Sequence, residues 1–185
     1  MSNPSLVIVL VEDQRQEVLV YKYLRHRGRE PHEIRIRPYP IGQGSAEGWV
    51  LSKFAAETGE YRNRQACKGE TALAVMIDAD ANTVERRWTQ LDQALAKTGE
   101  KKISKRERIV RLVPKRNVET WILCLTSERE LDEDTNYKRE KHKWHELIPT
   151  AAGTLREWSR PKTELPAHCL NSLRLGVQEL KRLDS

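Results

Sequence analysis

The chain has 185 residues, of which 32% are charged and 38% hydrophobic, and its formal net charge is +6. This length suits one compact domain and is too short for two comfortable ones, which excludes a large multidomain machine. The basic balance favours anionic partners, with nucleic acid first and acidic protein or membrane surfaces after it.

Cysteine usage and hydropathy narrow the class further. Cys67, Cys124 and Cys169 are far apart, and no pair has CxxC spacing, which argues against a zinc site or a disulfide framework. The first residues lack the features of a signal peptide, and no stretch reaches membrane-spanning length. We therefore expect a cytoplasmic protein without a membrane segment.

Four short segments have the composition of β-strands. Residues 6–11 (LVIVLV) and 73–77 (LAVMI) are continuous apolar runs, which are typical of central parallel strands covered on both faces. Residues 33–37 (EIRIR) alternate between polar and apolar side chains, which predicts a strand nearer an edge. Residues 108–113 (RIVRLV) are the fourth predicted strand, and Pro114 ends it.

Segments with helical spacing alternate with these strands. The patterns predict helices at 14–27, 45–57, 84–95, 117–125, 150–158 and 172–183. Ser45 is the predicted N-cap of the second helix, and either Asn82 or Thr83 caps the third. Residues 58–70 are polar and irregular, and residues 127–146 are highly charged. Within the second stretch, residues 138–145 (KREKHKWH) add basic residues, and an amphipathic helix with Trp144 in the core is favoured over base stacking on Trp144.

Alternating strands and helices predict an α/β fold with a mostly parallel central sheet that is flanked by helices. We expect the α/β domain to span residues 1–125. A charged, mainly helical C-terminal extension, residues 126–185, should pack on it. In such sheets ligands bind beyond the carboxyl ends of the strands, so acidic residues at those ends are the first candidates for a site.

Two of the predicted buried strands end in carboxylates. Glu12 and Asp13 follow the first strand, and Asp78-Ala79-Asp80 follows the second apolar run. Asp78 and Asp80 would project to one side if that strand continued so far, and two carboxylates so close repel each other unless a cation neutralises them. Mg²⁺ typically takes one or two carboxylates and shares its other positions with water and phosphate.

An ordinary structural role is the alternative for these acids. Asp80 can cap the helix that follows it, and both aspartates can be solvated loop residues, because Asp-x-Asp is a short motif. Glu12 weakens this alternative, since it brings a third acid to the same sheet edge from a separate strand.

These motifs together resemble the Toprim domain, which occurs in topoisomerases, DnaG-type primases, small ribosomal-RNA maturases and overcoming-lysogenization-defect (OLD) nucleases. The strongest resemblance is to the small, stand-alone, OLD-nuclease-related Toprim-like proteins of bacterial defence and mobile-element loci. It covers residues 6–125 and is carried by VE at 11–12, MIDAD at 76–80 and PKRNVETW at 114–121.

The resemblance implies that Glu12, Asp78 and Asp80 bind Mg²⁺, with Mn²⁺ as a substitute, for nucleotidyl transfer or phosphodiester hydrolysis. The expected function is a metal-dependent nuclease that acts on DNA or RNA. The likeness to defence proteins also implies a separate ABC- or SMC-like ATPase subunit, and no stretch of this chain fits GxxxxGK[ST].

The chain departs from the OLD-like pattern at the first motif. Members of that group often have Gly after the first Glu and another acid four residues on, where this chain has Asp13 and Gln16, with Glu17 one place later. These departures argue against a second metal ion held by the first predicted helix.

The third motif adds two candidates. Glu119 can act as an extra ligand for metal or water, and the alternative is favourable electrostatics in the first turn of a helix. Lys115, like Arg116, can neutralise a phosphate or a developing negative charge, and the alternative is a solvated helix start.

The segment 101–116 is rich in basic residues: it has eight of them and a single acid, Glu107. We predict a track for the phosphate backbone of nucleic acid, which supplies little sequence specificity. A plain solvated loop and strand edge is the alternative. The candidate contacts are Lys101, Lys102, Lys105, Arg106, Arg108 and Arg116.

The last predicted helix has apolar residues beyond one stripe. Leu173, Val177 and Leu180 share a stripe, while Leu175 lies off it. A second apolar side needs another surface, so we expect a chain that works in a larger assembly or forms a homodimer through this region. The alternative is a helix wedged between two layers of one chain.

Two other functions compete with the nuclease. A non-catalytic regulatory or assembly subunit would keep the acids without the chemistry, and Gln16 in place of an acid supports it. A receiver-like domain would use Glu12-Asp13 as its acidic pair, Asp78 as the phosphoacceptor and Lys115 after a later strand.

Overall fold

The computed structural model describes residues 4–39, 45–67 and 69–184. Within these residues the protein has one sheet of four parallel strands in the order β2-β1-β3-β4. The strands are β1 (Leu6–Leu10), β2 (Ile34–Ile36), β3 (Thr71–Met76) and β4 (Ile109–Leu112). The predicted α/β class with a parallel sheet flanked by helices is confirmed.

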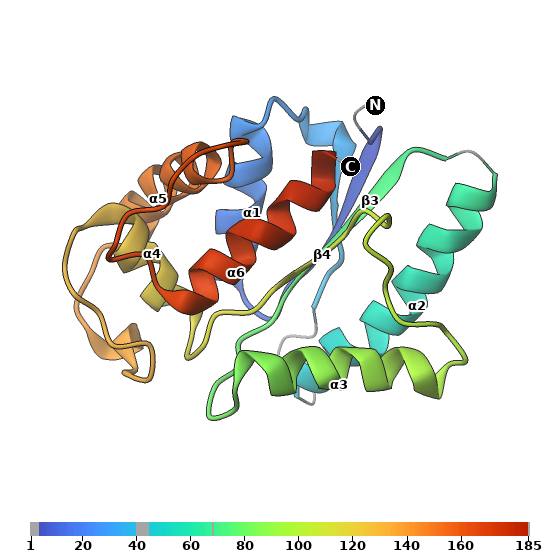
Figure 1. The fold of residues 1–185 in the computed structure, drawn as a ribbon, viewed down its shortest axis with the longest axis horizontal. Helices are drawn as coiled ribbons and strands as arrows, with labels where there is room; N and C mark the ends of the chain where they lie inside the picture. The colour runs from blue at the N-terminus through green and yellow to red at the C-terminus, as the bar shows by residue number, and fades with distance from the viewer. Residues whose placement is uncertain (1–3, 40–44, 68, 185) are drawn as a thin grey trace.

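Helices cover both faces of the sheet, which makes three layers (Figure 1). One face carries α1 (Gln14–His26), α4 (Val118–Thr126), α5 (Trp144–Trp158) and α6 (Asn171–Leu180). The other face carries α2 (Ala46–Ala66) and α3 (Val84–Lys97). Short 3-10 turns at Pro31–Glu33, Tyr137–Arg139 and Lys181–Asp184 complete the described elements.

The alternation of side chains along each strand divides the core in two. In β1, Val7 and Val9 pack into the cluster under α1, α4, α5 and α6, while Ile8 and Leu10 pack into the cluster under α2 and α3. Because β1 and β3 are covered on both sides, they are apolar throughout. β2 pairs with β1 alone and lies at the edge of the sheet, as its alternating sequence predicts.

Local capping signals set the helix starts. The side chains of Ser45, Thr83 and Asn117 each accept a backbone N–H from the first turn of α2, α3 and α4. Ser45 and Thr83 were predicted caps, and both are confirmed.

Two helices extend beyond their predicted bounds: α2 continues through much of the stretch 58–70, and α5 begins before residue 150. α2 continues to Ala66 because Tyr61 is buried and its hydroxyl accepts the backbone N–H of Arg108 at 2.9 Å. α5 begins at Trp144, within the charged stretch, because Trp144 and Ile148 are buried against the sheet-facing core. In both cases tertiary packing outweighs a polar local sequence.

α6 is packed between two parts of the same chain. This is the alternative given above, in place of the expected second apolar side that would bind a partner. Leu173, Val177 and Leu180 are fully buried in one core cluster, and Leu175 packs against the other. The Glu179 carboxylate accepts the outward N–H of Arg111 at 3.0 Å and so covers the edge of β4. The apolar side chains of α6 therefore give no reason to expect a dimer interface here.

No helix in the described part of the chain is long and apolar enough to cross a bilayer.

Close packing of α6 on α4 makes a stability test. A Cβ at Gly176 would overlap the ring of Trp121, which is fully buried and donates to the Ser172 hydroxyl at 2.8 Å. We expect Gly176→Ala to lower the free energy of unfolding by about 1–3 kcal/mol, measured by urea denaturation, because the ring cannot move aside.

The control is Gly153→Ala in α5, where a Cβ would meet nothing nearer than His26 Nε2 at 4.0 Å. It should be neutral or stabilise by up to about 1 kcal/mol through helix propensity. Equal effects at both glycines would contradict the packing described here.

Candidate metal centre

The order of the strands places a switch point, where sheets of this type usually have their crevice, between β1 and β3. The chain leaves β1 through α1 on one face of the sheet and leaves β3 through α3 on the opposite face. The connections after these neighbouring strands therefore diverge, which is the topological switch point at which α/β sheets bind ligands. Glu12 follows β1 and Asp78 follows β3, so the two acids flank this crevice.

Glu12 and Asp78 are in direct contact. The backbone N–H of Asp78 donates to Glu12 Oε2 at 2.6 Å. Gln16, which is fully buried in α1, bridges the pair: its carbonyl oxygen accepts the Glu12 N–H at 2.9 Å and its NH₂ donates to Asp78 Oδ1 at 2.9 Å. Gln16 thus holds the two carboxylates together.

Asp13 has a structural role beside them. Its side chain accepts the backbone N–H of Gln16 at 3.0 Å and caps α1. Its extended backbone, φ −146°, needs no glycine. The cap fixes the start of the helix that carries Gln16.

Burial makes both carboxyl groups hold their protons more strongly. Asp78 is 3% exposed, and burial, followed by the charge of Glu12, raises its pKa well above the ordinary value. Burial also raises the pKa of Glu12, although the Asp78 N–H and Gln16 act in the opposite direction. Two desolvated acids that repel each other are the electrostatic condition that a cation relieves.

Asp80 does not join this contact. β3 ends at Met76, and Asp80 has a left-handed backbone, φ 55°, so it does not share a side of a strand with Asp78. Its side chain is 56% exposed, and its carboxylate lies 3.9 Å from the Arg87 guanidinium. Asp80 does not cap the following helix, which was the alternative role, because Thr83 is the N-cap of α3. Its charge still raises the pKa of Glu12, so Asp80 stands near the crevice, and its role as a ligand stays a prediction.

Arg87, which the sequence analysis did not single out, fixes the loop after β3. It is fully buried, its Nε donates to the Asp78 carbonyl at 2.9 Å, and it pairs with Glu47. Its position in the sequence could have identified it. Arg87 lies on the same helical stripe as the buried Val84 and Leu91, and a buried arginine needs a polar partner.

Glu119 lies in the first turn of α4 and is fully buried. One carboxylate oxygen pairs with Arg15 of α1, and the other, Oε2, has no hydrogen-bond partner. The charge of Glu119 is one of the smaller contributions to the raised pKa of Asp78. The structure therefore shows Glu119 as a buried acid that acts on Asp78 through its charge, with one oxygen free of hydrogen bonds.

The sequence did not identify Lys138 as a site residue, because it is one of several basic residues in the charged stretch 127–146. Its Nζ is 3.6 Å from Asp78 Oδ2. Burial disfavours the ammonium, but the charges of Asp78, Glu119, Asp13 and Asp80 outweigh burial and raise the pKa of Lys138.

The other predicted basic residues lie elsewhere. Lys115 pairs with Asp134 at 2.6 Å and makes no contact with the acids. β4 runs parallel to β3, with Ile109 beside Leu73, so residues 101–108 lie at the amino edge of the sheet, opposite the acids. Of the six predicted nucleic-acid contacts, only Arg116 follows β4 and lies toward the carboxyl edge. The other five precede β4: Lys101, Lys102, Lys105, Arg106 and Arg108.

The acid group fits a small site better than a large one. Among the described residues, no three side chains of His, Cys, Asp or Glu lie close enough together to hold a metal ion. Glu12 and Asp78 do meet the one- or two-carboxylate pattern of Mg²⁺, and the unpartnered Glu119 Oε2 is a third oxygen in reach of their charge. The residues fit a two-carboxylate Mg²⁺ site and do not show the predicted three-carboxylate one.

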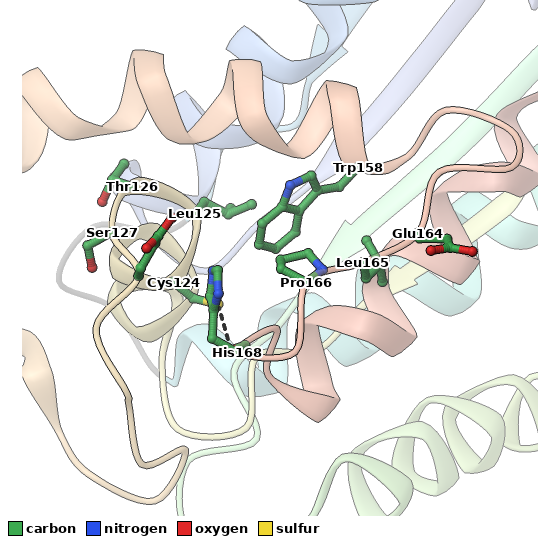
Figure 2. A pocket seen from close by; sticks show the side chains of 10 residues that line it. Cys124, Leu125, Thr126, Ser127, Trp158, Glu164, Leu165, Pro166 and His168 are labelled. Carbon is green, nitrogen blue, oxygen red and sulfur yellow. Dashed lines mark hydrogen bonds between the residues drawn. The ribbon is translucent and has the colours of Figure 1, made fainter.

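The hollows of the surface lie away from this group. Figure 2 shows one of about 580 Å³, between the end of α4, Trp158 and the segment that carries Glu164 and His168. None of the acids above lines it. It is wide open and contains none of the carboxylates at the switch point, so those carboxylates define the candidate site.

Comparison of the chain with protein-family models, curated proteins and solved structures gives no match. The geometry of the acid group is therefore the basis for the proposals that follow.

The raised pKa values predict how stability depends on pH. In EDTA, folded Glu12 and Asp78 keep protons that the unfolded chain, with carboxyl pKa values of about 4, has lost. The folded state then binds more protons, so stability should fall as pH rises from about 5 to 7, measured by thermal melting. Carboxyls with lowered pKa, such as Glu140 at about 2, act below this window.

Asp78→Asn should reduce this slope, since it removes one of the two groups. Excess Mn²⁺ should reverse it, because the metal binds the ionised carboxylates and gives about 2.7 kcal/mol at a hundred times its Kd. Stability that rises with pH over this window in EDTA would contradict the burial described here.

Proposed function

We propose that this chain is an Mg²⁺-dependent enzyme that cleaves phosphodiester bonds in DNA or RNA. The observation that carries the proposal is the contact between Glu12 and Asp78 at the switch point of the sheet. A buried and a half-buried carboxylate at a switch point of the sheet suit a hard divalent cation that is shared with a phosphate.

Each residue has a part in this proposal. A bound Mg²⁺ supplies polarisation of the phosphoryl oxygen and a lower pKa for a bound water. Glu12 and Asp78 hold the cation, Gln16 keeps their separation, and Arg87 fixes the Asp78 carbonyl. The buried Glu119 Oε2 is available to accept a proton or to orient a water.

The competing functions differ in what they need. A receiver-like domain needs an accessible phosphoacceptor with a lysine beside it. Lys138 does lie beside Asp78, but Asp78 is only 3% exposed, and Lys115, the lysine predicted for this role, pairs with Asp134. The geometry thus disfavours phosphotransfer to Asp78. A non-catalytic subunit that binds metal stays the alternative, and a cleavage assay separates it from the enzyme. The separate ABC- or SMC-like ATPase and the homodimer stay predictions.

Metal binding tests the proposal directly. Glu12→Gln and Asp78→Asn should each lower the affinity for Mn²⁺ by about a hundredfold or more, measured by calorimetric titration, because each removes a ligand charge. Asp80→Asn should change it by less than about tenfold, because its carboxylate points to Arg87 and solvent.

The matched control is Asp134→Asn, an exposed aspartate outside the acid group. Wild-type affinity in the Asp78 variant would sink the metal centre. Loss of Mn²⁺ binding in that variant, together with no Mn²⁺-dependent cleavage of single- or double-stranded DNA or RNA by the wild type, would establish the non-catalytic alternative.

The basic loop provides a separate test of nucleic-acid binding. Lys101, Lys102, Lys105 and Arg106 are exposed, while the acids nearby, Glu100 and Glu107, pair with Arg62. Changing these four basic residues to Gln should reduce the log–log salt dependence of binding by roughly 0.7–0.9 per lost phosphate contact.

A control with equal charge loss changes Lys53, Lys141, Lys143 and Lys162, which are exposed on other surfaces. The same change of slope in both variants would mean that the loop acts only through net charge and is no specific track.

A further inference from the structure

Lys138 occupies the open side of the acid group. Its Nζ lies 3.6 Å from Asp78 Oδ2, and its side chain is 39% exposed, so the ammonium sits between the buried carboxylates and solvent. Asp78, Glu119, Asp13 and Asp80 are the acids whose charges act on it. A positive group among carboxylates is what a metal ion would provide at this position.

The position of Lys138 is built by the third motif. The Asn117 amide, which caps α4 two residues before Glu119, donates to Asn136 Oδ1 at 3.0 Å. The same Asn136 oxygen accepts the backbone N–H of Lys138 at 3.1 Å. Tyr137 is buried and its hydroxyl accepts the backbone N–H of Asp132 at 3.0 Å, which anchors the turn. Lys138 is thus held to the start of α4 and is no free surface lysine.

The remaining charges leave no room for a second ion. Of the acids near the crevice, Glu119 pairs with Arg15, Asp13 is used as the cap of α1, and Asp80 points to Arg87. Sites with two metal ions hold them about 4 Å apart and need carboxylates that bridge or flank both. Here a second ion beside Asp78 would meet the Lys138 ammonium.

We propose that the Lys138 ammonium takes the place of a second metal ion, so that this centre holds one divalent cation. The inference rests on the proposed metal centre and specifies its composition. The lysine neutralises the outer oxygen of Asp78, and its other N–H groups face the open side, where a phosphate oxygen of the substrate can accept from them.

The stoichiometry of Mn²⁺ binding to the full chain tests this, by calorimetry and by the electron paramagnetic resonance signal of free Mn²⁺. Wild type should bind about one ion, and Lys138→Met should bind about two, because Asp78 Oδ2 and the unpartnered Glu119 Oε2 then lose the positive charge of the ammonium. Lys138→Arg retains the charge and should stay at about one. Lys143→Met, an exposed lysine in the same extension that pairs with Glu146, should also stay at about one.

Asn136→Ala gives a second approach that leaves the lysine in place. It removes the acceptor that positions the Lys138 backbone, and the second ion should then bind with measurable affinity. Circular dichroism shows whether each variant is folded.

The outcomes separate the two proposals. One ion in both wild type and Lys138→Met, or two in wild type, overturns the role of Lys138 and leaves the metal centre standing. Mn²⁺ binding by neither wild type nor Lys138→Met rejects the metal centre itself, and this inference with it.

Discussion

The contact between the Asp78 N–H and the Glu12 carboxylate is the constraint on which the rest of the site depends. It joins the ends of two adjacent parallel strands and brings the half-buried Glu12 to the buried Asp78. An isolated ionised carboxylate is costly to bury, so the protein surrounds this pair with donors. Gln16 of α1 donates to Asp78 Oδ1, and Lys138 of the C-terminal extension forms an ion pair with Asp78 Oδ2. Arg87 of α3 donates to the Asp78 backbone carbonyl and so fixes the loop that carries the aspartate.

This arrangement explains why the extension contributes to the site as well as to the core. α5 packs against α1 and α4, and the segment between α4 and α5 carries Lys138 to Asp78. The Asn117–Asn136 hydrogen bond ties that segment to the third motif. A chain ending near residue 125 would keep the strands and the acids but would lose the cation beside Asp78.

Much of the fold could be read from local patterns, since they reflect local physics. The apolar runs of β1 and β3 follow from burial on both faces, and Ser45 and Thr83 follow from unpaired N–H groups at helix starts. Glu12 and Asp78 could also be predicted to lie together, because the carboxyl ends of parallel strands are at the same edge of the sheet. The direction of Asp80 was not, because it depends on a left-handed residue after the strand has ended.

Partners that are distant in sequence escaped prediction for a related reason. Lys138 is one lysine among many in a charged stretch. Only the folded chain shows that it contacts Asp78, an aspartate 60 residues earlier in the sequence. Glu119 was identified by its motif, but its burial and its unpartnered oxygen depend on Arg15 in another helix. Charge pattern alone also misplaced the basic loop, because a segment that leads into a parallel strand begins at the edge opposite its carboxyl end.

That last point constrains how the two proposed surfaces can work together. The acids lie at the carboxyl edge and the exposed loop residues Lys101 to Arg106 at the amino edge, separated by the length of β3. Six residues of strand span about 20 Å, since each adds about 3.3 Å. One strand of duplex DNA rises about 3.4 Å per base pair, so about six base pairs are the least that could touch both surfaces. The loop is therefore suited to anchoring a long nucleic acid, while the phosphate nearest the carboxylates depends on the cations around Asp78.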